Sequence, residues 1–154
     1  MTGLDPAAFR ARIVEPTLRH LQLWSPAAEW LVLATAVHES GLSALIQVGG
    51  PALGVYQIEA ETYFDVIARL TARHHELAAR LGELKAEIPA PLVQLVSNLA
   101  YATAVCRLIY YLDPEPLPPA GARHALAWYW KRVYNTDDGA GTVPTFLLHN
   151  QNIA

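Results

Sequence analysis

Residues 25–41 read SPAAEWLVLATAVHESG, and this stretch decides the fold that the sequence predicts. Ser25 is a residue type that caps helix N-termini, and Pro26 suits the first helical position. Gly41 is typical of the position just past a helix C-terminus. The apolar residues between these signals cover more than one helical face, which predicts a buried central helix rather than a surface helix.

The remaining segments are also predicted to be helices and loops. Asp5-Pro6 repeats the cap-and-proline signal and opens a helix that should end or kink near Pro16. Apolar periodicity and proline or glycine breaks predict further helices at 17–24, 60–81, 91–112 and 122–134 and after Pro144, and loops at 42–54, 113–121 and 135–142. The 60–81 helix has as its core candidates Phe64, Ile67, Leu70, Leu77 and Leu81. With only a short strand expected near 46–48, the fold class is mainly α.

Length and composition favour one globular domain over residues 1–154. The chain has 154 residues, of which 53% are hydrophobic and 16% charged, so a sizeable core is expected. The net charge of −3 provides no strong basic field for nucleic acid or an anionic membrane, and neither partner is predicted. The one cysteine, Cys106, lies in an apolar stretch and is expected in the core.

The N-terminal stretch Met1–Pro6 lacks the basic and apolar regions of a signal peptide. The longest apolar run, 30–37, is far shorter than the ~20 residues that span a bilayer. A role at a cell wall would therefore require another means of delivery.

Glu39 is the residue on which the functional interpretation depends. It ends a strongly apolar helix, where burial and the negative end of the helix dipole both disfavour a carboxylate. Both effects raise the pKa, and a carboxyl protonated near neutral pH can protonate a leaving glycosidic oxygen. An isolated carboxylate there is more often a solvated helix-end residue, so the neighbouring motifs carry the interpretation.

Two further motifs follow Glu39-Ser40 along the chain. The first is Gly54-Val55-Tyr56-Gln57-Ile58 with Thr62 beyond it, and the second is Tyr134-Asn135 followed by Gly139-Ala140-Gly141. Together the motifs resemble the goose-type lysozyme and soluble lytic transglycosylase group of the lysozyme-like superfamily. That group has a Glu-Ser pair, then Gly-Leu-Met-Gln-Ile/Leu at the same interval, a Thr, and later Ala-Tyr-Asn before Gly-x-Gly.

The resemblance implies a lysozyme-like helical domain with a central buried helix and a short loop/β segment. It makes Glu39 the general acid and then the base in cleavage of peptidoglycan glycan strands, as a lytic transglycosylase or a muramidase. Ser40 would steady Glu39 or touch the sugar. Tyr56 and Gln57 would line the cleft and bond to an N-acetyl group or a hydroxyl.

The distal motif has implied roles as well. Tyr134 would point its hydroxyl toward Glu39, and Asn135 would hold the cleft wall. A two-carboxylate hydrolase would need a partner for Glu39, and the nearest candidates in sequence are Glu59, Glu61 and Asp65. Glu59 and Glu61 also suit the first turn of a helix, where acids are favourable, so the single-carboxylate transglycosylase scheme stays open beside the hydrolase scheme.

No cofactor and no metal are predicted. His38 precedes Glu39 without a His-Glu-x-x-His pattern, and His74-His75-Glu76 has no further ligands close in sequence. The aromatic stretch 128–134 suits sugar stacking, although about half of it should be core.

The lack of a signal-peptide pattern, the compact size and the Tyr-Trp-Lys…Tyr-Asn-Thr sequence within 129–136 resemble a bacteriophage protein, so the resemblance implies a bacteriophage muralytic glycosidase. Its partners would be peptidoglycan glycan strands and phage tail or ejection proteins. It would reside in the virion or, as an endolysin, in the host cytoplasm before release, and would degrade the cell wall from the periplasm.

Val48, Pro51 and Ala60 depart from the family pattern. They motivate the alternative of a catalytically inactive lysozyme-fold component of the virion that binds glycan or a neighbouring subunit. A small helical adaptor is the remote third option.

Overall fold

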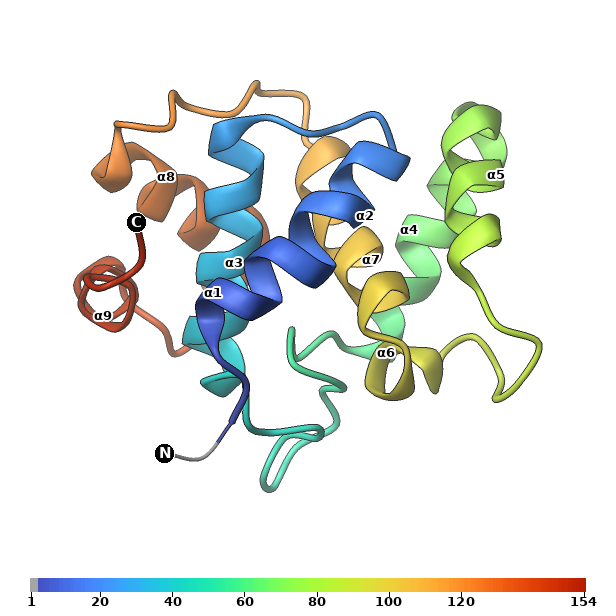
Figure 1. Ribbon diagram of the computed structural model, residues 1–154, viewed down its shortest axis with the longest axis horizontal. Helices are drawn as coiled ribbons and strands as arrows, with labels where there is room; N and C mark the ends of the chain where they lie inside the picture. Colours follow the sequence, from blue (N-terminus) through green and yellow to red (C-terminus); the bar gives the residue numbers. More distant parts are fainter. Residues whose placement is uncertain (1–2) are drawn as a thin grey trace.

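The computed structural model describes residues 3–154, and the prediction of a mainly α fold is confirmed (Figure 1). Met1 and Thr2, the first residues of the stretch without a signal-peptide pattern, lie outside the described residues. The elements in chain order are α1 (Pro6–Phe9), the π-helix η1 (Arg10–Val14), α2 (Glu15–His20), α3 (Pro26–Ser40), α4 (Ala60–Arg73), α5 (His75–Leu84), α6 (Gln94–Ser97), α7 (Leu99–Tyr111), α8 (Arg123–Trp130), the π-helix η2 (Lys131–Asn135) and α9 (Val143–His149).

The helix α3 is central and buried, as the sequence predicts. The Ser25 hydroxyl accepts a hydrogen bond of 3.0 Å from the amide of Ala28, and Gly41 ends the helix at φ 60°. Nearly every residue from Ala27 to Ala36 is buried. In Figure 1, α3 stands among helices from both ends of the chain, and it packs against α1, η1, α2, α7, α8 and α9.

The N-terminal helical run does not end at Pro16. The Asp5 carboxylate caps it as predicted, accepting a 2.8 Å hydrogen bond from the Ala8 amide. The run then widens into η1 and continues into α2, and Pro16, which has no N–H to donate, lies two residues beyond the wider turn.

Two long helices predicted from the sequence are each interrupted. The 60–81 helix divides into α4 and α5 at His74, and the 91–112 helix divides into α6 and α7 at Asn98. The Asn98 side chain accepts a 3.0 Å hydrogen bond from the Tyr101 amide, so it caps a new helix rather than continuing the old one. Phe64 is 57% exposed, so its assignment to the core is wrong.

The core draws on helices along the whole described chain and includes Cys106, as predicted. Its fully buried large side chains include Trp130, Tyr56, Tyr110 and Phe146. Among the described residues, no helix is long and apolar enough to cross a membrane.

The segment between α3 and α4 consists mainly of turns. Within residues 3–154 the expected strand at 46–48 does not form, and only isolated antiparallel bridges join Ile46 to Leu53 and Leu53 to Ile58. Gly54 makes the turn between the bridges at φ 75°, and a Cβ there would lie 1.9 Å from the Leu95 carbonyl oxygen. Only glycine fits this position, so the turn is held against the start of α6.

Candidate active site

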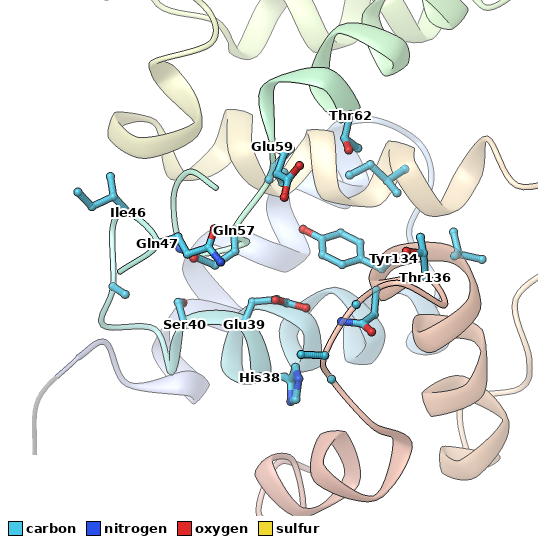
Figure 2. Close-up of a pocket in the computed structure, with 18 of the residues that line it drawn as sticks. His38, Glu39, Ser40, Ile46, Gln47, Gln57, Glu59, Thr62, Tyr134 and Thr136 are labelled. Atoms are coloured by element: carbon cyan, nitrogen blue, oxygen red, sulfur yellow. The ribbon is translucent and has the colours of Figure 1, made fainter. Parts of the chain in front are cut away.

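An open cleft of about 710 Å³ lies beside the C-terminal end of α3 (Figure 2). Its walls come from the segment between α3 and α4, the start of α4, η2 and the loop before α9. The lining residues include His38, Glu39, Ser40, Gln47, Val48, Gln57, Glu59, Thr62, Tyr134, Asn135, Thr136, Gly139 and Gly141. The volume lies in the range of small-molecule sites.

Glu39 lies on the cleft wall, one residue before the end of α3. Its carboxyl is partly buried, and this burial raises its pKa from 4.5 to about 7. The Trp130 indole N–H donates a 3.3 Å hydrogen bond to Oε1, which opposes the rise by stabilising the carboxylate. Burial has the larger effect, so Glu39 is protonated for part of the time at neutral pH.

Trp130 is fixed by its aromatic neighbours. It is fully buried at the end of α8 and stacks on Phe146 of α9 at a centroid distance of 4.4 Å. The His38 ring packs edge-on against it at 4.7 Å. The rigid stack aims the indole N–H at Glu39, since an indole packed on two sides has little rotational freedom.

His38 lines the cleft as an uncharged imidazole. Its Nδ1 lies 2.9 Å from Nδ1 of His149, so one ring donates and the other accepts. Burial, together with the neighbouring His149, lowers the pKa of His38 to about 4. Near neutral pH, His38 therefore places no positive charge beside Glu39, and such a charge would have lowered the pKa of the carboxyl.

Ser40 connects the end of α3 to the turn at 54–57. Its hydroxyl oxygen lies 2.6 Å from the Val55 carbonyl and 3.1 Å from the Ala36 carbonyl, and it accepts a hydrogen bond from the Leu42 amide. These bonds fix the end of the helix against the turn at 54–57. The predicted steadying of Glu39 would thus act through the backbone, because Ser40 bonds to Val55 and not to the carboxyl.

Tyr134 projects into the cleft from η2, and Figure 2 shows it between the side chains of Glu39 and Glu59. Its hydroxyl donates a 2.5 Å hydrogen bond to the Tyr56 carbonyl. The prediction that the hydroxyl points toward Glu39 is therefore wrong. Its ring stacks on Tyr110 at 5.5 Å. Burial holds the pKa of Tyr134 well above its ordinary value, so the phenol stays protonated.

Tyr56 does not line the cleft, and its assignment to substrate binding is wrong. The side chain is fully buried, and its hydroxyl lies 2.9 Å from that of Thr103 in α7. Tyr56 enters the core, whereas Gln57, the next residue, lines the cleft. Gln57 adopts φ 51°, and its side-chain N–H donates a 2.8 Å hydrogen bond to the Gly54 carbonyl.

Asn135 lies on the cleft wall, where it was expected. Its side-chain oxygen accepts a 2.6 Å hydrogen bond from Lys131, which also donates to the carbonyls of Thr136 and Gly139. A Cβ on Gly139 would lie 2.4 Å from the Asn135 carbonyl oxygen. The glycine therefore allows the loop to pack directly on η2.

Only one of the three candidate second carboxylates lies in the cleft. Glu59 is the exposed N-cap residue of α4 and lines the cleft, whereas Glu61 and Asp65 are exposed on α4 and are not among the lining residues. Glu61 and Asp65 are therefore removed as candidates, and Glu59 remains.

Metal ligands do not gather in the described part of the chain. Within residues 3–154, no group of three His, Cys, Asp or Glu side chains is arranged to hold a metal ion. His38 and His149 form a pair without a third such neighbour.

No protein-family model, curated protein or solved structure matches this chain.

The sequence interpretation missed two residues that matter to Glu39. Trp130 was grouped with an aromatic stretch, yet it lies four residues before Tyr134, and this spacing places both on one helical face. His38 was weighed only as a metal ligand. Its place in the cleft follows from its adjacency to Glu39 at an exposed helix end, but its pairing with His149 has no local signal.

Proposed function

We propose that residues 1–154 form a single lysozyme-like domain that cleaves the glycan strands of peptidoglycan, with Glu39 as general acid and base. One observation carries the proposal: the Glu39 carboxyl lies in an open cleft, and burial raises its pKa to about 7. A carboxyl with this pKa holds a proton at neutral pH and is a strong enough acid to give it up.

The reaction needs one proton transfer in each direction. Glu39 donates its proton to the glycosidic oxygen as the bond from that oxygen to the anomeric carbon breaks, and the bonding electrons leave with the oxygen. The Glu39 carboxylate then removes a proton from the group that attacks the anomeric carbon. If that group is water, the product has a reducing end. If it is the 6-hydroxyl of the same sugar, the product is an anhydrosugar.

Three side chains of the cleft have hydrogen-bonding capacity left for a sugar. Gln57 uses a side-chain N–H internally, which leaves its carbonyl oxygen free to accept from an amide or hydroxyl. Tyr134 donates its only hydroxyl proton to the Tyr56 carbonyl, so its oxygen can only accept. The side-chain N–H groups of Asn135 can donate to a hydroxyl or an acetyl oxygen.

The two-carboxylate hydrolase and the lytic transglycosylase differ in whether they need Glu59. A hydrolase of the two-carboxylate kind would use Glu59 across the cleft from Glu39 to activate water or to act as nucleophile. A lytic transglycosylase does not need it. The resemblance of the motifs favours the transglycosylase.

The biological setting remains part of the proposal. The enzyme would belong to a bacteriophage, either carried in the virion with tail or ejection proteins or made as an endolysin in the host cytoplasm, and it would act on the cell wall. This rests on the resemblance and not on a physical argument.

A catalytically inactive, glycan-binding virion component is the second candidate. The observation that favours it is Val48, which lines the cleft at 97% exposure, where many members of the group that the motifs resemble have a serine. A valine cannot donate a hydrogen bond to the sugar, so one substrate contact would be lost.

The test is digestion of purified peptidoglycan with mass spectrometry of the products. Wild type should release muropeptides, and Glu39→Gln should lower the rate by at least about 10³-fold, because glutamine keeps the shape but supplies no proton. Glu61→Gln is the matched control, since this exposed carboxylate lies outside the cleft, and it should keep full activity.

The same digest separates the alternatives. If wild type produces anhydro ends and Glu59→Gln stays active, the enzyme is a transglycosylase. If wild type produces reducing ends and Glu59→Gln is inactive, the enzyme is a two-carboxylate hydrolase. Folded wild type that releases nothing from several wall types would contradict the enzyme and favour the glycan-binding component.

A further inference from the structure

The chain has two lysines, Lys85 and Lys131, and Lys131 uses all of its donors within the protein. Its ammonium nitrogen donates hydrogen bonds of 2.6 Å to the Asn135 side-chain oxygen, 2.9 Å to the Thr136 carbonyl and 3.0 Å to the Gly139 carbonyl. A lysine ammonium has three N–H groups, so none is left for a ligand. Lys131 is not among the residues that line the cleft, but its three partners are.

The segment that Lys131 holds is not a regular helix. Residues 131–135 form η2, and the Thr136 amide donates a 2.7 Å hydrogen bond to the Lys131 carbonyl, five positions earlier. Such π-helical turns are rare and occur frequently at functional sites. The turn supplies Tyr134 and Asn135 to the cleft. This wall of the cleft therefore depends on an uncommon backbone geometry.

Thr136 follows η2 in a conformation that is essentially confined to glycine. Its φ is 66° and its ψ is 171°, so this β-branched residue is strained, and it lines the cleft. Such strain persists only where surrounding contacts hold the backbone in place. The Thr136 carbonyl accepts from the Lys131 ammonium and the Gly139 amide, and the Thr136 amide donates to the Lys131 carbonyl. Lys131 thus provides contacts on both sides of the strained residue.

The three acceptors match an ammonium and not a guanidinium. They surround one nitrogen, whereas an arginine spreads its donors over separate nitrogens in a plane. Within residues 3–154, Lys131 forms no ion pair, although Asp137 and Asp138 are close in sequence. Lys131 therefore acts on this segment through directed hydrogen bonds to neutral oxygens.

Lys131 also fixes which way the Asn135 amide faces. An ammonium can only donate, so the side-chain oxygen of Asn135 must face it and the side-chain N–H groups face away. Those N–H groups are the donors that the proposed function assigns to a sugar hydroxyl or acetyl oxygen. Without the ammonium, the amide could rotate and present its oxygen in their place.

We propose that Lys131 is a positioning residue that holds Asn135 and Thr136 in the geometry that binds the glycan. The proposal rests on the proposed function and adds to it a residue that lies outside the cleft lining. Substrate binding and proton transfer by Glu39 should therefore respond differently when Lys131 is changed.

The kinetic test uses soluble, uncrosslinked glycan strands. Lys131→Met keeps the length of the side chain and removes its donors, so it should raise KM about tenfold and leave kcat within about twofold of wild type. The pKa of Glu39, measured by NMR, should stay at about 7. Lys85→Met is the matched control, since Lys85 is exposed at the end of α5 and outside the cleft lining, and it should change neither constant.

Chemical rescue separates the lost ammonium from general damage to the fold. Lys131→Cys should show the same rise in KM, and alkylation with bromoethylamine, which attaches an aminoethyl group to the thiol, should reverse it. The product carries an ammonium at nearly the position of the lysine nitrogen. The fully buried Cys106 should not react in the folded protein, and alkylated wild type is the control. Lys131→Arg should not restore KM.

Amide hydrogen exchange tests the same contacts without cleavage. The Gly139 amide donates a 3.2 Å hydrogen bond to the Thr136 carbonyl, and its exchange should be at least about tenfold faster in Lys131→Met than in wild type. Unchanged exchange, unchanged KM or a shifted Glu39 pKa in Lys131→Met would overturn the proposal, as would alkylation that restores nothing. If wild type cleaved no strands, the proposed function and the glycan-binding role of Lys131 would fail together, and the exchange would still show whether Lys131 holds this segment.

Discussion

At the scale of the residue, Glu39 is subject to two opposing influences. Burial raises its pKa, and the hydrogen bond from Trp130 lowers it. A carboxylate exposed to water would be ionised at neutral pH, and a fully buried one would not release its proton. The intermediate position, with the carboxyl open to the cleft on one side, gives a pKa of about 7.

The raised pKa has a stability cost that Glu39→Gln should remove. The folded protein holds this proton up to pH 7, whereas the unfolded chain releases it near pH 4.5, so the free energy of unfolding falls as pH rises from 4.5 to 7. The full difference is about 3 kcal/mol. The free energy of unfolding of Glu39→Gln, relative to that of wild type, should therefore be about 3 kcal/mol higher at pH 8 than at pH 4.

Urea unfolding at the two pH values measures this effect. Glu61→Gln controls for the loss of an exposed charge and should show nearly the same difference from wild type at both pH values. A Glu39→Gln variant with the same relative stability at pH 4 and pH 8 would mean that the folded carboxyl has an ordinary pKa.

The sequence correctly predicts a partly buried carboxyl at Glu39 but wrongly places Tyr56 in the cleft, and the difference has a physical reason. The acid could be found because its position at the end of an apolar helix is a local pattern that predicts partial burial of its carboxyl. The burial of Tyr56 depends on Thr103, 47 positions later, which receives the hydroxyl inside α7. No local pattern distinguishes a tyrosine that enters the core from one that enters a cleft.

At the scale of the element, helix ends could be predicted and helix interruptions could not. Asp5, Ser25 and Gly41 act through their own backbone neighbours, so their residue types were sufficient. The break at Asn98 depends also on its side-chain N–H, which donates to the distant Leu84 carbonyl. The strand expected at 46–48 is replaced by isolated bridges, because the glycines around it favour turns over pairing.

The loop before α9 should tolerate no side chain at Gly141. A Cβ there would lie 2.7 Å from the buried Trp130 ring and 3.2 Å from Nε2 of His38. Gly141→Ala should destabilise the protein by about 1–3 kcal/mol and lower the cleavage rate, since displacing Trp130 weakens its hydrogen bond to Glu39.

Gly82→Ala is the matched control for this prediction. Gly82 lies in α5, and a Cβ there would meet no atom within 4 Å. Alanine should stabilise the helix by about 0.5–1 kcal/mol. Thermal unfolding and digestion rates test both variants, and a Gly141→Ala protein as stable and active as wild type would contradict the close packing of the loop.

At the scale of the whole molecule, the site is assembled from parts that are far apart in the sequence. Glu39 and Trp130 are separated by 91 positions, and Tyr134 reaches Tyr56 across 78. The contacts of α3 with α7, α8 and α9 bring these parts together. The pKa of Glu39 is therefore a property of the folded molecule and should be lost on unfolding.

The central claim, that folding makes Glu39 an acid suited to neutral pH, is tested most directly by NMR titration of its side-chain carboxyl carbon. The protein would carry ¹³C-labelled glutamate, and Glu39→Gln would assign the signal. The account predicts a pKa of about 7 in the folded protein and a return to about 4.5 in urea. A Glu39 that titrates near 4.5 in the folded protein would contradict it.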